Sequence, residues 1–168
     1  MITVRKLTPD DLTAYRALHR EALGEPGSLG FVQNLEEDAR VPDAEVAAML
    51  ARGEAWGAFK DGALVAKLTI DVLPFAVLAH TRWIHAMYAS PAARGTGAAR
   101  ALVEAAIADA RAVGALRIML WVNAENPRAR GFYGALGFRE AGRIPEGLNI
   151  GGRWMDDIMM CLKTGQEG

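Results

Sequence analysis

The chain has 168 residues, of which 51% are hydrophobic and 23% charged, and its formal net charge is −1. This length fits one domain over residues 1–168, and the balanced charge does not favour general binding to nucleic acid or anionic membranes. The single cysteine excludes an internal disulfide, and no Cys/His cluster has zinc spacing. No apolar run reaches the roughly 20 residues of a membrane span, and the start lacks a signal-peptide pattern. We therefore expect a cytoplasmic, metal-free protein.

The predicted elements begin with a strand in ITVRKL and a helix in TPDDLTAYRALHREAL. Residues 24–30 are expected to form a loop. A second helical region covers about residues 32–50 and is interrupted near Pro42. Two strands follow, joined by Asp61 and Gly62, because Asp-Gly is a strong hairpin signal. The segment HTRWIHAMYA is predicted to form the next strand.

A helix with one apolar face follows the paired glycines of ARGTGAARALVEAAIADARAVGA. Arg100 and Glu104 are spaced as an i,i+4 ion pair on its exposed side, and Gly114 is the expected left-handed terminator. The apolar stripe at helical spacing comprises Ala99, Leu102, Val103, Ala106, Ile107, Ala110 and Val113.

The remaining segments complete a mixed α/β pattern. LRIMLWV is predicted to be a strand, NPRARGFYGALG a short helix, and FREAG and RWMDDIMMCLK the last strands. One face of the first strand carries Leu116, Ile118, Leu120 and Val122. A strand–helix–strand crossover inside a largely antiparallel set predicts a mixed, mostly antiparallel twisted sheet with helices on both faces.

Gly95 and Gly97 stand between a strand and a helix, where open amides and the helix dipole make an anion site. Glycine also lets the backbone approach a phosphate closely. A P-loop is excluded, because Ala98 and Ala99 stand where Lys and Ser or Thr are needed. A dinucleotide fingerprint lacks its third glycine, since Arg100 occupies that position. A tight turn without a ligand is the alternative to a pyrophosphate site.

The surroundings of these glycines resemble the GNAT superfamily of N-acetyltransferases. MYASPAARGTGAARALVEAAI resembles the acetyl-CoA signature of that family, and LWVNAENPRARGFYGALGF resembles its second signature. The end GGRWMDDIMMCL is similar to the closing strands of many members. Two positions depart from the pattern. Ala92 stands where many members have Gln or Arg, and Trp83 falls near the place where several members keep a catalytic glutamate.

The resemblance implies that acetyl-CoA binds along this segment as the acetyl donor. The pantetheine arm would pair with the backbone of Met87 and Ala89, where the strands carrying Tyr88 and Trp121 splay apart. Asn126 would touch the same arm, although capping of its own helix explains this residue without any ligand. The pyrophosphate would take open amides at the start of the helix, in the stretch Arg94, Gly95, Thr96, Gly97, Ala98, Ala99 and Arg100.

Two side chains are candidates for catalysis. In the family the tyrosine that corresponds to Tyr133 lies beside the thioester sulfur, and core packing is its alternative role. His85 shares a strand face with Met87, and the ordinary histidine pKa of about 6.5 suits removal of a proton from an amine. A histidine merely packed in the sheet is the alternative to a base at that position. The other candidates for the base are a water chain and the carboxylates Asp71, Glu125 and Asp156.

Other polar groups are given structural roles. His19 and His80 are expected at the surface, and Cys161 is expected to be an inert core residue. An acidic run comprising Glu36, Glu37 and Asp38 either attracts a cationic amine or forms a solvated helix face.

The function that the resemblance implies is acetyl transfer from acetyl-CoA to a primary amine, by direct attack in a ternary complex. The alternative is a non-catalytic acyl-CoA-binding or sensory module on the same scaffold. The acceptor would be a small-molecule or peptide amine, held by residues 31–50 and the loop after Ile144. No nucleic-acid or membrane partner is expected, and a homodimer stays open.

Overall fold

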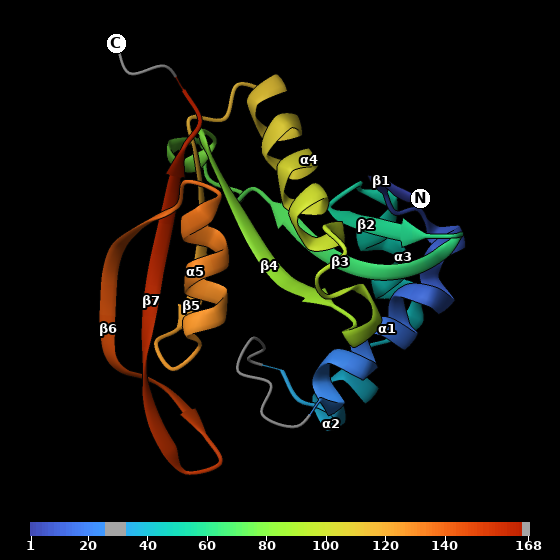
Figure 1. The fold of residues 1–168 in the computed structure, drawn as a ribbon, viewed down its shortest axis with the longest axis horizontal. Helices are drawn as coiled ribbons and strands as arrows, with labels where there is room; N and C mark the ends of the chain where they lie inside the picture. Colours follow the sequence, from blue (N-terminus) through green and yellow to red (C-terminus); the bar gives the residue numbers. More distant parts are fainter. Residues whose placement is uncertain (26–32, 166–168) are drawn as a thin grey trace. The chain divides into compact units, whose positions relative to one another are not determined.

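Residues 1–25 and 33–165 are described by the computed structural model shown in Figure 1. Seven strands form one sheet in the order β1-β2-β3-β4-β5-β7-β6. The ladders β1–β2, β2–β3, β5–β7 and β6–β7 are antiparallel, and β4–β5 is parallel. The predicted mixed, mostly antiparallel sheet is therefore confirmed. Most of the loop expected over residues 24–30 lies outside the described residues.

The elements follow each other in the predicted order. The strands are β1 (Ile2–Lys6), β2 (Ala55–Lys60), β3 (Ala63–Asp71), β4 (Thr81–Ala89), β5 (Arg117–Asn123), β6 (Arg139–Ile150) and β7 (Arg153–Lys163). The helices are α1 (Leu12–Gly24), α2 (Leu35–Ala39), α3 (Asp43–Ala51), α4 (Ala98–Ala112) and α5 (Pro127–Ala135). Within the described part of the chain, no helix has the length and apolar character of a membrane span.

The chain divides into two compact units. The first comprises Met1–Ile70 and Ala86–Ala106, and the second comprises Asp71–His85 and Ile107–Gly168. In the first unit, β2 and β3 form the predicted hairpin, in which Lys60 pairs with Ala63. Asp61 and Gly62 between them have φ of 51° and 84°, the left-handed pair that a two-residue turn requires.

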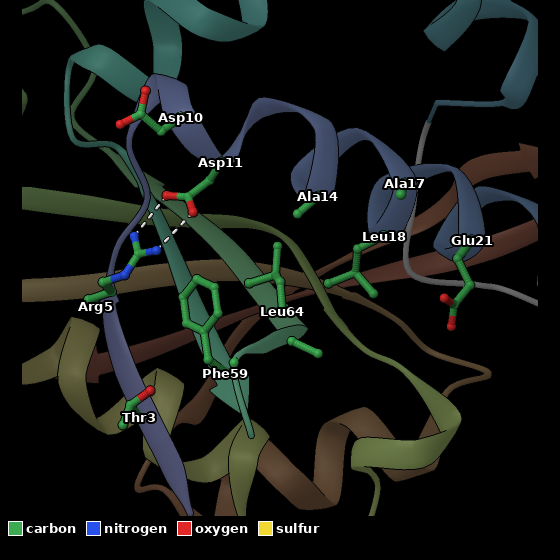
Figure 2. Close-up of a pocket in the computed structure, with 12 residues that line it drawn as sticks. Thr3, Arg5, Asp10, Asp11, Ala14, Ala17, Leu18, Glu21, Phe59 and Leu64 are labelled. Carbon is green, nitrogen blue, oxygen red and sulfur yellow. Dashed lines mark hydrogen bonds and ion pairs between the residues drawn. The ribbon is translucent and has the colours of Figure 1, made fainter.

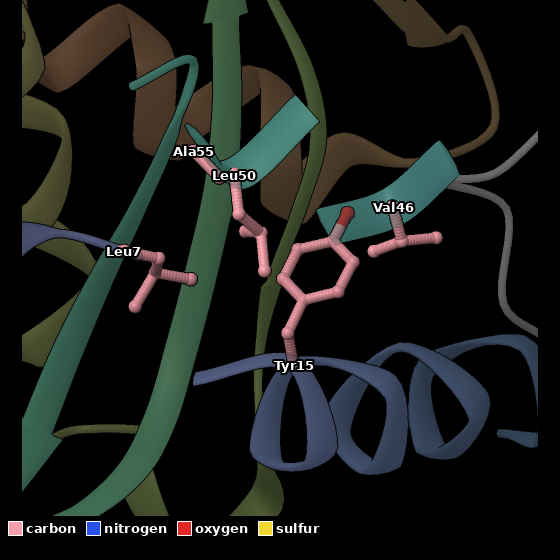
Figure 3. Packing of buried hydrophobic residues seen from close by; sticks show 5 residues of the cluster. All are labelled: Leu7, Tyr15, Val46, Leu50 and Ala55. Carbon is pink, nitrogen blue, oxygen red and sulfur yellow. The ribbon is translucent and has the colours of Figure 1, made fainter. Parts of the chain in front are cut away.

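Helices α1 and α3 bury an apolar cluster against strand β2 and the end of β1 (Figure 3). The predicted helical region around Pro42 is two helices, α2 and α3, because this proline is the N-cap of the second. Fully burying one aliphatic side chain of this apolar cluster contributes about 1.5–3 kcal/mol to the stability of the fold. The buried members of the cluster are Leu7, Tyr15, Val46, Leu50 and Ala55.

A buried ion-pair network joins α1 to α2. The carboxylate of Asp38 accepts hydrogen bonds from Nη1 of Arg16 at 2.9 Å and from Nε of Arg20 at 3.2 Å. Nε2 of His19 lies 3.7 Å from the same carboxylate. The prediction of a surface position for His19 is wrong, since α1 buries it, and this burial lowers the pKa of its imidazole. Asp38 belongs neither to a solvated face nor to an open acidic patch, because two guanidinium groups neutralise it.

In the second unit, β5 and β7 pair from Arg117 with Lys163 to Asn123 with Asp157. The buried face of β5 carries Ile118, Leu120 and Val122 as predicted, whereas Leu116 precedes the strand and is exposed. Strand β6 differs from the expectation of a loop after Ile144. It continues to Ile150 and pairs with β7, with a register shift between Ile144 and Leu148. Cys161 lies partly buried on β7.

Helix α4 has the predicted amphipathic character. Gly114 follows its last turn with φ of 75°, and the predicted pair of Arg100 and Glu104 forms at 2.8 Å. The predicted stripe differs from the structure at the two ends of the helix. Ala98 is the buried residue of the first turn, and Val113 is exposed because the helix ends before it.

Candidate active site

Gly95 and Gly97 form an open turn ahead of α4. Both have left-handed backbones, with φ of 77° and 85°, which favour glycine over any other residue. A Cβ built at either position meets no described atom within 4 Å. The glycines therefore leave a cradle of accessible backbone at the positive end of a helix of 15 residues.

The turn uses some of the amides that were expected to be open. Arg94 and Thr96 donate to the carbonyls of Pro91 and Ala93, at 3.3 and 3.2 Å, and Ala98 donates to the Thr96 hydroxyl at 3.4 Å. The prediction that the whole stretch from Arg94 to Ala99 is open is therefore wrong for these three residues. Within residues 1–25 and 33–165, we find no acceptor for the amides of Gly95, Gly97, Ala99 and Arg100.

The side chain of Arg94 ties this turn to the end of α1. Its Nη2 lies 2.6 Å from both carboxylate oxygens of Glu25, and its Nε donates to the carbonyl of Ala89 at 3.3 Å. The hydroxyl of Tyr88 donates to Glu21 on the same helix at 3.0 Å. Burial, together with these two carboxylates, raises the pKa of Tyr88. The Tyr88 side chain is thus directed toward α1 and packs with Leu18.

His85 lies on β4 next to the carboxylate of Asp71 at the end of β3. Its Nε2 is 3.2 Å from Oδ1 of Asp71, and both side chains are partly exposed. The geometry suits an imidazole whose orientation a carboxylate fixes. Two of the candidate bases, His85 and Asp71, are thus neighbours. The ladder from β4 to β5 pairs Thr81–Trp83 with Arg117–Met119.

The other carboxylates proposed as bases are engaged in ion pairs. Glu125 pairs with Nη2 of Arg153. Asp156 accepts from Nη1 of Arg143 at 2.9 Å and from the amide of Glu146 at 3.0 Å. These hydrogen bonds lower the pKa of Asp156, so its carboxylate is a weaker base than an ordinary aspartate.

Tyr133 and Asn126 lie on and before α5. The Tyr133 ring packs edge-on against Phe132 and Phe138, with ring centroids 5.2 and 5.5 Å away. Burial raises the pKa of its hydroxyl above the ordinary tyrosine value. Asn126 is the N-cap, because its Oδ1 accepts from the amide of Ala129 at 3.0 Å. The capping role is therefore confirmed, and contact with a ligand stays a prediction.

Among the hollows that the described residues form, two lie in the first unit. The smaller, of about 390 Å³, is bordered by Glu25, Tyr88 and Pro91, next to the glycine turn. The larger, of about 700 Å³, lies between α1 and the first three strands (Figure 2), and none of the predicted site residues lines it. Across its floor, Arg5 pairs with Asp11 at 2.8 Å and stacks over Phe59.

Sequence reasoning missed two features of β3 and β4. Ala86 has a left-handed backbone inside β4, and Lys67 is wholly buried on β3 with its Nζ 3.1 Å from the Ala86 carbonyl. The signal for Lys67 was a single charge inside the apolar run ALVAKLTI. No residue type marked Ala86, because alanine has no preference for left-handed backbone.

Comparison with known proteins places the chain in a family. Residues 13–138 match the model of the acetyltransferase (GNAT) family. Over 53 residues the chain is 47% identical to an uncharacterized N-acetyltransferase of Mycobacterium tuberculosis, a match that covers 32% of this chain and 34% of that protein. The chain therefore aligns with about a third of the length of this curated relative.

Solved structures share the fold along nearly the whole chain. An acetyltransferase of the GNAT family from Streptococcus pneumoniae has a TM-score of 0.85 and 20% identity, covering 98% of this chain and 100% of that chain. A phosphinothricin acetyltransferase from Sinorhizobium meliloti, in complex with acetyl-CoA, has a TM-score of 0.82 and 21% identity, covering 96% and 88%. With the family model spanning most of its length, this chain belongs to the acetyltransferase (GNAT) family.

Proposed function

We propose that this protein is an acetyl-CoA-dependent N-acetyltransferase that moves the acetyl group to a primary amine by direct attack in a ternary complex. The observation that carries the proposal is the open glycine turn before α4, in a chain of this family. Gly95 and Gly97 leave room for a phosphate where a Cβ would otherwise stand. The amides of Gly95, Gly97 and Ala99 supply donors for the pyrophosphate, and the helix dipole adds positive potential.

The residues of β4 supply the second part of the proposed site. The backbone of Met87 and Ala89 would pair with the pantetheine arm, since both residues directly precede the glycine turn. Arg94 has a structural role as well, because its pairing with Glu25 holds the turn against the end of α1. Acetyl-CoA supplies an activated acetyl thioester when it is bound, and the chain supplies orientation and proton transfer.

We assign removal of the amine proton to His85, with Asp71 as the group that orients it. An amine is nucleophilic only after it has lost its extra proton, so a base must act before or during attack. In the transfer a C–N bond forms and the C–S bond breaks, the amine proton passes to His85, and the sulfur departs as a thiolate. The contact of 3.2 Å between His85 and Asp71 favours His85 over the ion-paired carboxylates.

Tyr133 is proposed to donate a hydrogen bond to the departing sulfur. An ordinary tyrosine has a pKa of about 10 and a thiol of about 8.5, so full proton transfer is already uphill. Burial raises the pKa of Tyr133 further, which increases that cost. A hydrogen bond that stabilises charge on sulfur is therefore favoured over general acid catalysis.

The test is incubation with acetyl-CoA and a panel of amines, amino acids and peptides, followed by detection of free thiol. Release of CoA that depends on a particular amine supports the enzyme. Acetyl-CoA binding in calorimetry without turnover on any amine supports a non-catalytic acyl-CoA-binding module. The panel also assigns the acceptor class, a small-molecule or a peptide amine.

A further inference from the structure

Ala86 adopts a backbone conformation that is costly for alanine. Its φ is 47°, in the left-handed region, although it lies in the interior of β4. Among the described non-glycine residues, only Asp61 and Glu146 share a positive φ, and Asp61 lies in a two-residue turn where such a value is usual. A strained residue inside a strand persists only where its surroundings hold it in place.

The amine of Lys67 provides such a hold. Its Nζ donates a hydrogen bond of 3.1 Å to the carbonyl oxygen of Ala86. A left-handed residue turns its carbonyl away from the regular strand ladder, so that oxygen needs a donor from elsewhere. Lys67 lies on β3, in the same compact unit as Ala86, and its Nζ is the donor that reaches the neighbouring strand β4.

Burial of this lysine is hard to explain by stability. Lys67 has 0% exposure and is flanked on β3 by the buried Ala66 and Leu68. An apolar residue of similar volume would avoid the cost of removing an amine from water. The Tyr15 ring lies 4.9 Å from Nζ, and the negative charge of Asp38 attracts it. The amine of Lys67 is thus held in place, although packing alone would not need an amine at this position and its removal from water is unfavourable.

We propose that Lys67 is a positioning residue that holds the left-handed backbone of Ala86 and so sets the direction of the Met87 and Ala89 backbone toward acyl-CoA. This inference rests on the proposed function, in which those two residues pair with the pantetheine arm. Lys67 itself touches no substrate and acts through the Ala86 carbonyl. Burial lowers the pKa of Lys67 to about 7, which agrees with an amine retained as a hydrogen-bond donor in an apolar site.

The test compares wild type with Lys67→Met, which keeps most of the apolar stem and removes the donor. Binding is measured by calorimetry with acetyl-CoA and with ADP, a probe that carries a diphosphate but no pantetheine arm. We expect acetyl-CoA to bind roughly 10-fold more weakly, because loss of the hydrogen bond from Lys67 to the Ala86 carbonyl releases the backbone that precedes Met87. ADP affinity should change less than twofold, because the glycine turn does not depend on Lys67.

A rescue separates positioning from general damage. Adding Ala86→Gly to Lys67→Met should recover most of the acetyl-CoA affinity, since glycine adopts a positive φ without a donor to hold it. Equal losses for acetyl-CoA and ADP, or no recovery with Ala86→Gly, would overturn the positioning role. Lys67→Gln, which keeps an N–H donor on a shorter stem, provides a second variant if Lys67→Met fails to fold.

A backbone readout keeps the inference separate from the proposed function. If wild type binds no acetyl-CoA at all, the proposed function fails. In that case amide hydrogen exchange over Ala86–Ala89 still tests Lys67. Faster exchange in Lys67→Met, with the rest of β3 and β4 unchanged, supports the hold on Ala86, and unchanged exchange overturns it.

Discussion

Nε2 of His85 lies 3.2 Å from Oδ1 of Asp71, which makes a histidine–carboxylate pair within the second compact unit. The first prediction follows from this pair. For a primary amine, kcat/KM should rise with pH through a limb between about pH 6 and 8, as expected for a histidine base. The limb should disappear in His85→Ala. Asp71→Asn should lower kcat/KM by less than His85→Ala does, because it keeps the imidazole and removes only the carboxylate that orients it.

The amine itself also titrates, so the control is an acceptor of different basicity. A limb that follows the acceptor and survives in His85→Ala would assign the ionisation to the substrate and remove His85 from the mechanism.

The second prediction concerns the cradle before α4. Gly95→Val should weaken acetyl-CoA binding at least about 10-fold, because the new side chain occupies space that a phosphate needs and strains a left-handed residue. Gly97→Pro should do the same and also removes an N–H donor. Titration calorimetry measures both.

Gly114→Val is a matched control for Gly95→Val. Gly114 has φ of 75° against 77°, and a Cβ at either position meets no described atom within 4 Å. The two variants should therefore lose similar thermal stability, yet only Gly95→Val should lose affinity for acetyl-CoA. Equal affinity in all three proteins would show that the turn before α4 binds nothing.

The third prediction concerns Tyr133. Tyr133→Phe keeps the ring between Phe132 and Phe138 and removes the hydroxyl. A hydrogen bond to a charged group contributes about 1.5–3 kcal/mol, so kcat at saturating acetyl-CoA should fall roughly 10- to 150-fold. The Kd for acetyl-CoA should change little. A loss of kcat below threefold, with normal thermal stability, would reduce Tyr133 to a core residue.

The fourth prediction uses the buried amine of Lys67, whose pKa burial lowers from 10.5 to about 7. Below pH 7 this amine is protonated in both the folded and the unfolded chain, so it does not make the free energy of unfolding depend on pH. Between about pH 7 and 10.5 the unfolded chain binds more protons, and its contribution to the free energy of unfolding rises with pH by up to about 1.4 kcal/mol per unit.

Denaturant unfolding of wild type and Lys67→Met at several pH values measures this slope. The free energy of unfolding of Lys67→Met relative to that of wild type should be highest at pH 6 to 7. As the pH rises, wild type should gain stability relative to the variant. A difference that stays constant from pH 7 to 10 would mean that the folded state does not depress the pKa of this lysine. The titratable groups around it, Asp38, His19 and Tyr15, are the same in both proteins.

The sequence predicted what local patterns determine. The stripe through Leu102, Val103 and Ala106 and the Asp61-Gly62 turn depend on residues close together in the chain, and both formed as expected. The positions of His19 and Asp38 were missed, because their burial depends on α1 meeting α2 through the pair of Arg16 and Asp38, which lie 22 positions apart in the chain.

In the candidate site, too, the features set by nearby residues were predicted and those set by distant residues were not. The glycines and the Asn126 cap were found from local sequence rules, since each shapes its own turn. The left-handed Ala86 was not found, because its conformation is held by Lys67 from another strand. Likewise, the pairing of Arg94 with Glu25 joins distant parts of the chain.

The central claim is acetyl transfer from acetyl-CoA directly to an amine, and intact-protein mass spectrometry tests it most directly. The protein is mixed first with acetyl-CoA carrying a 13C-labelled acetyl group, and then with an amine acceptor. We predict that the protein mass stays unchanged at the first step, and that the label appears in the amine product at the second. A labelled protein that passes its acetyl group to the amine, at the partly buried Cys161 or elsewhere, would contradict direct attack. Label that never leaves acetyl-CoA with any amine would contradict the transferase itself.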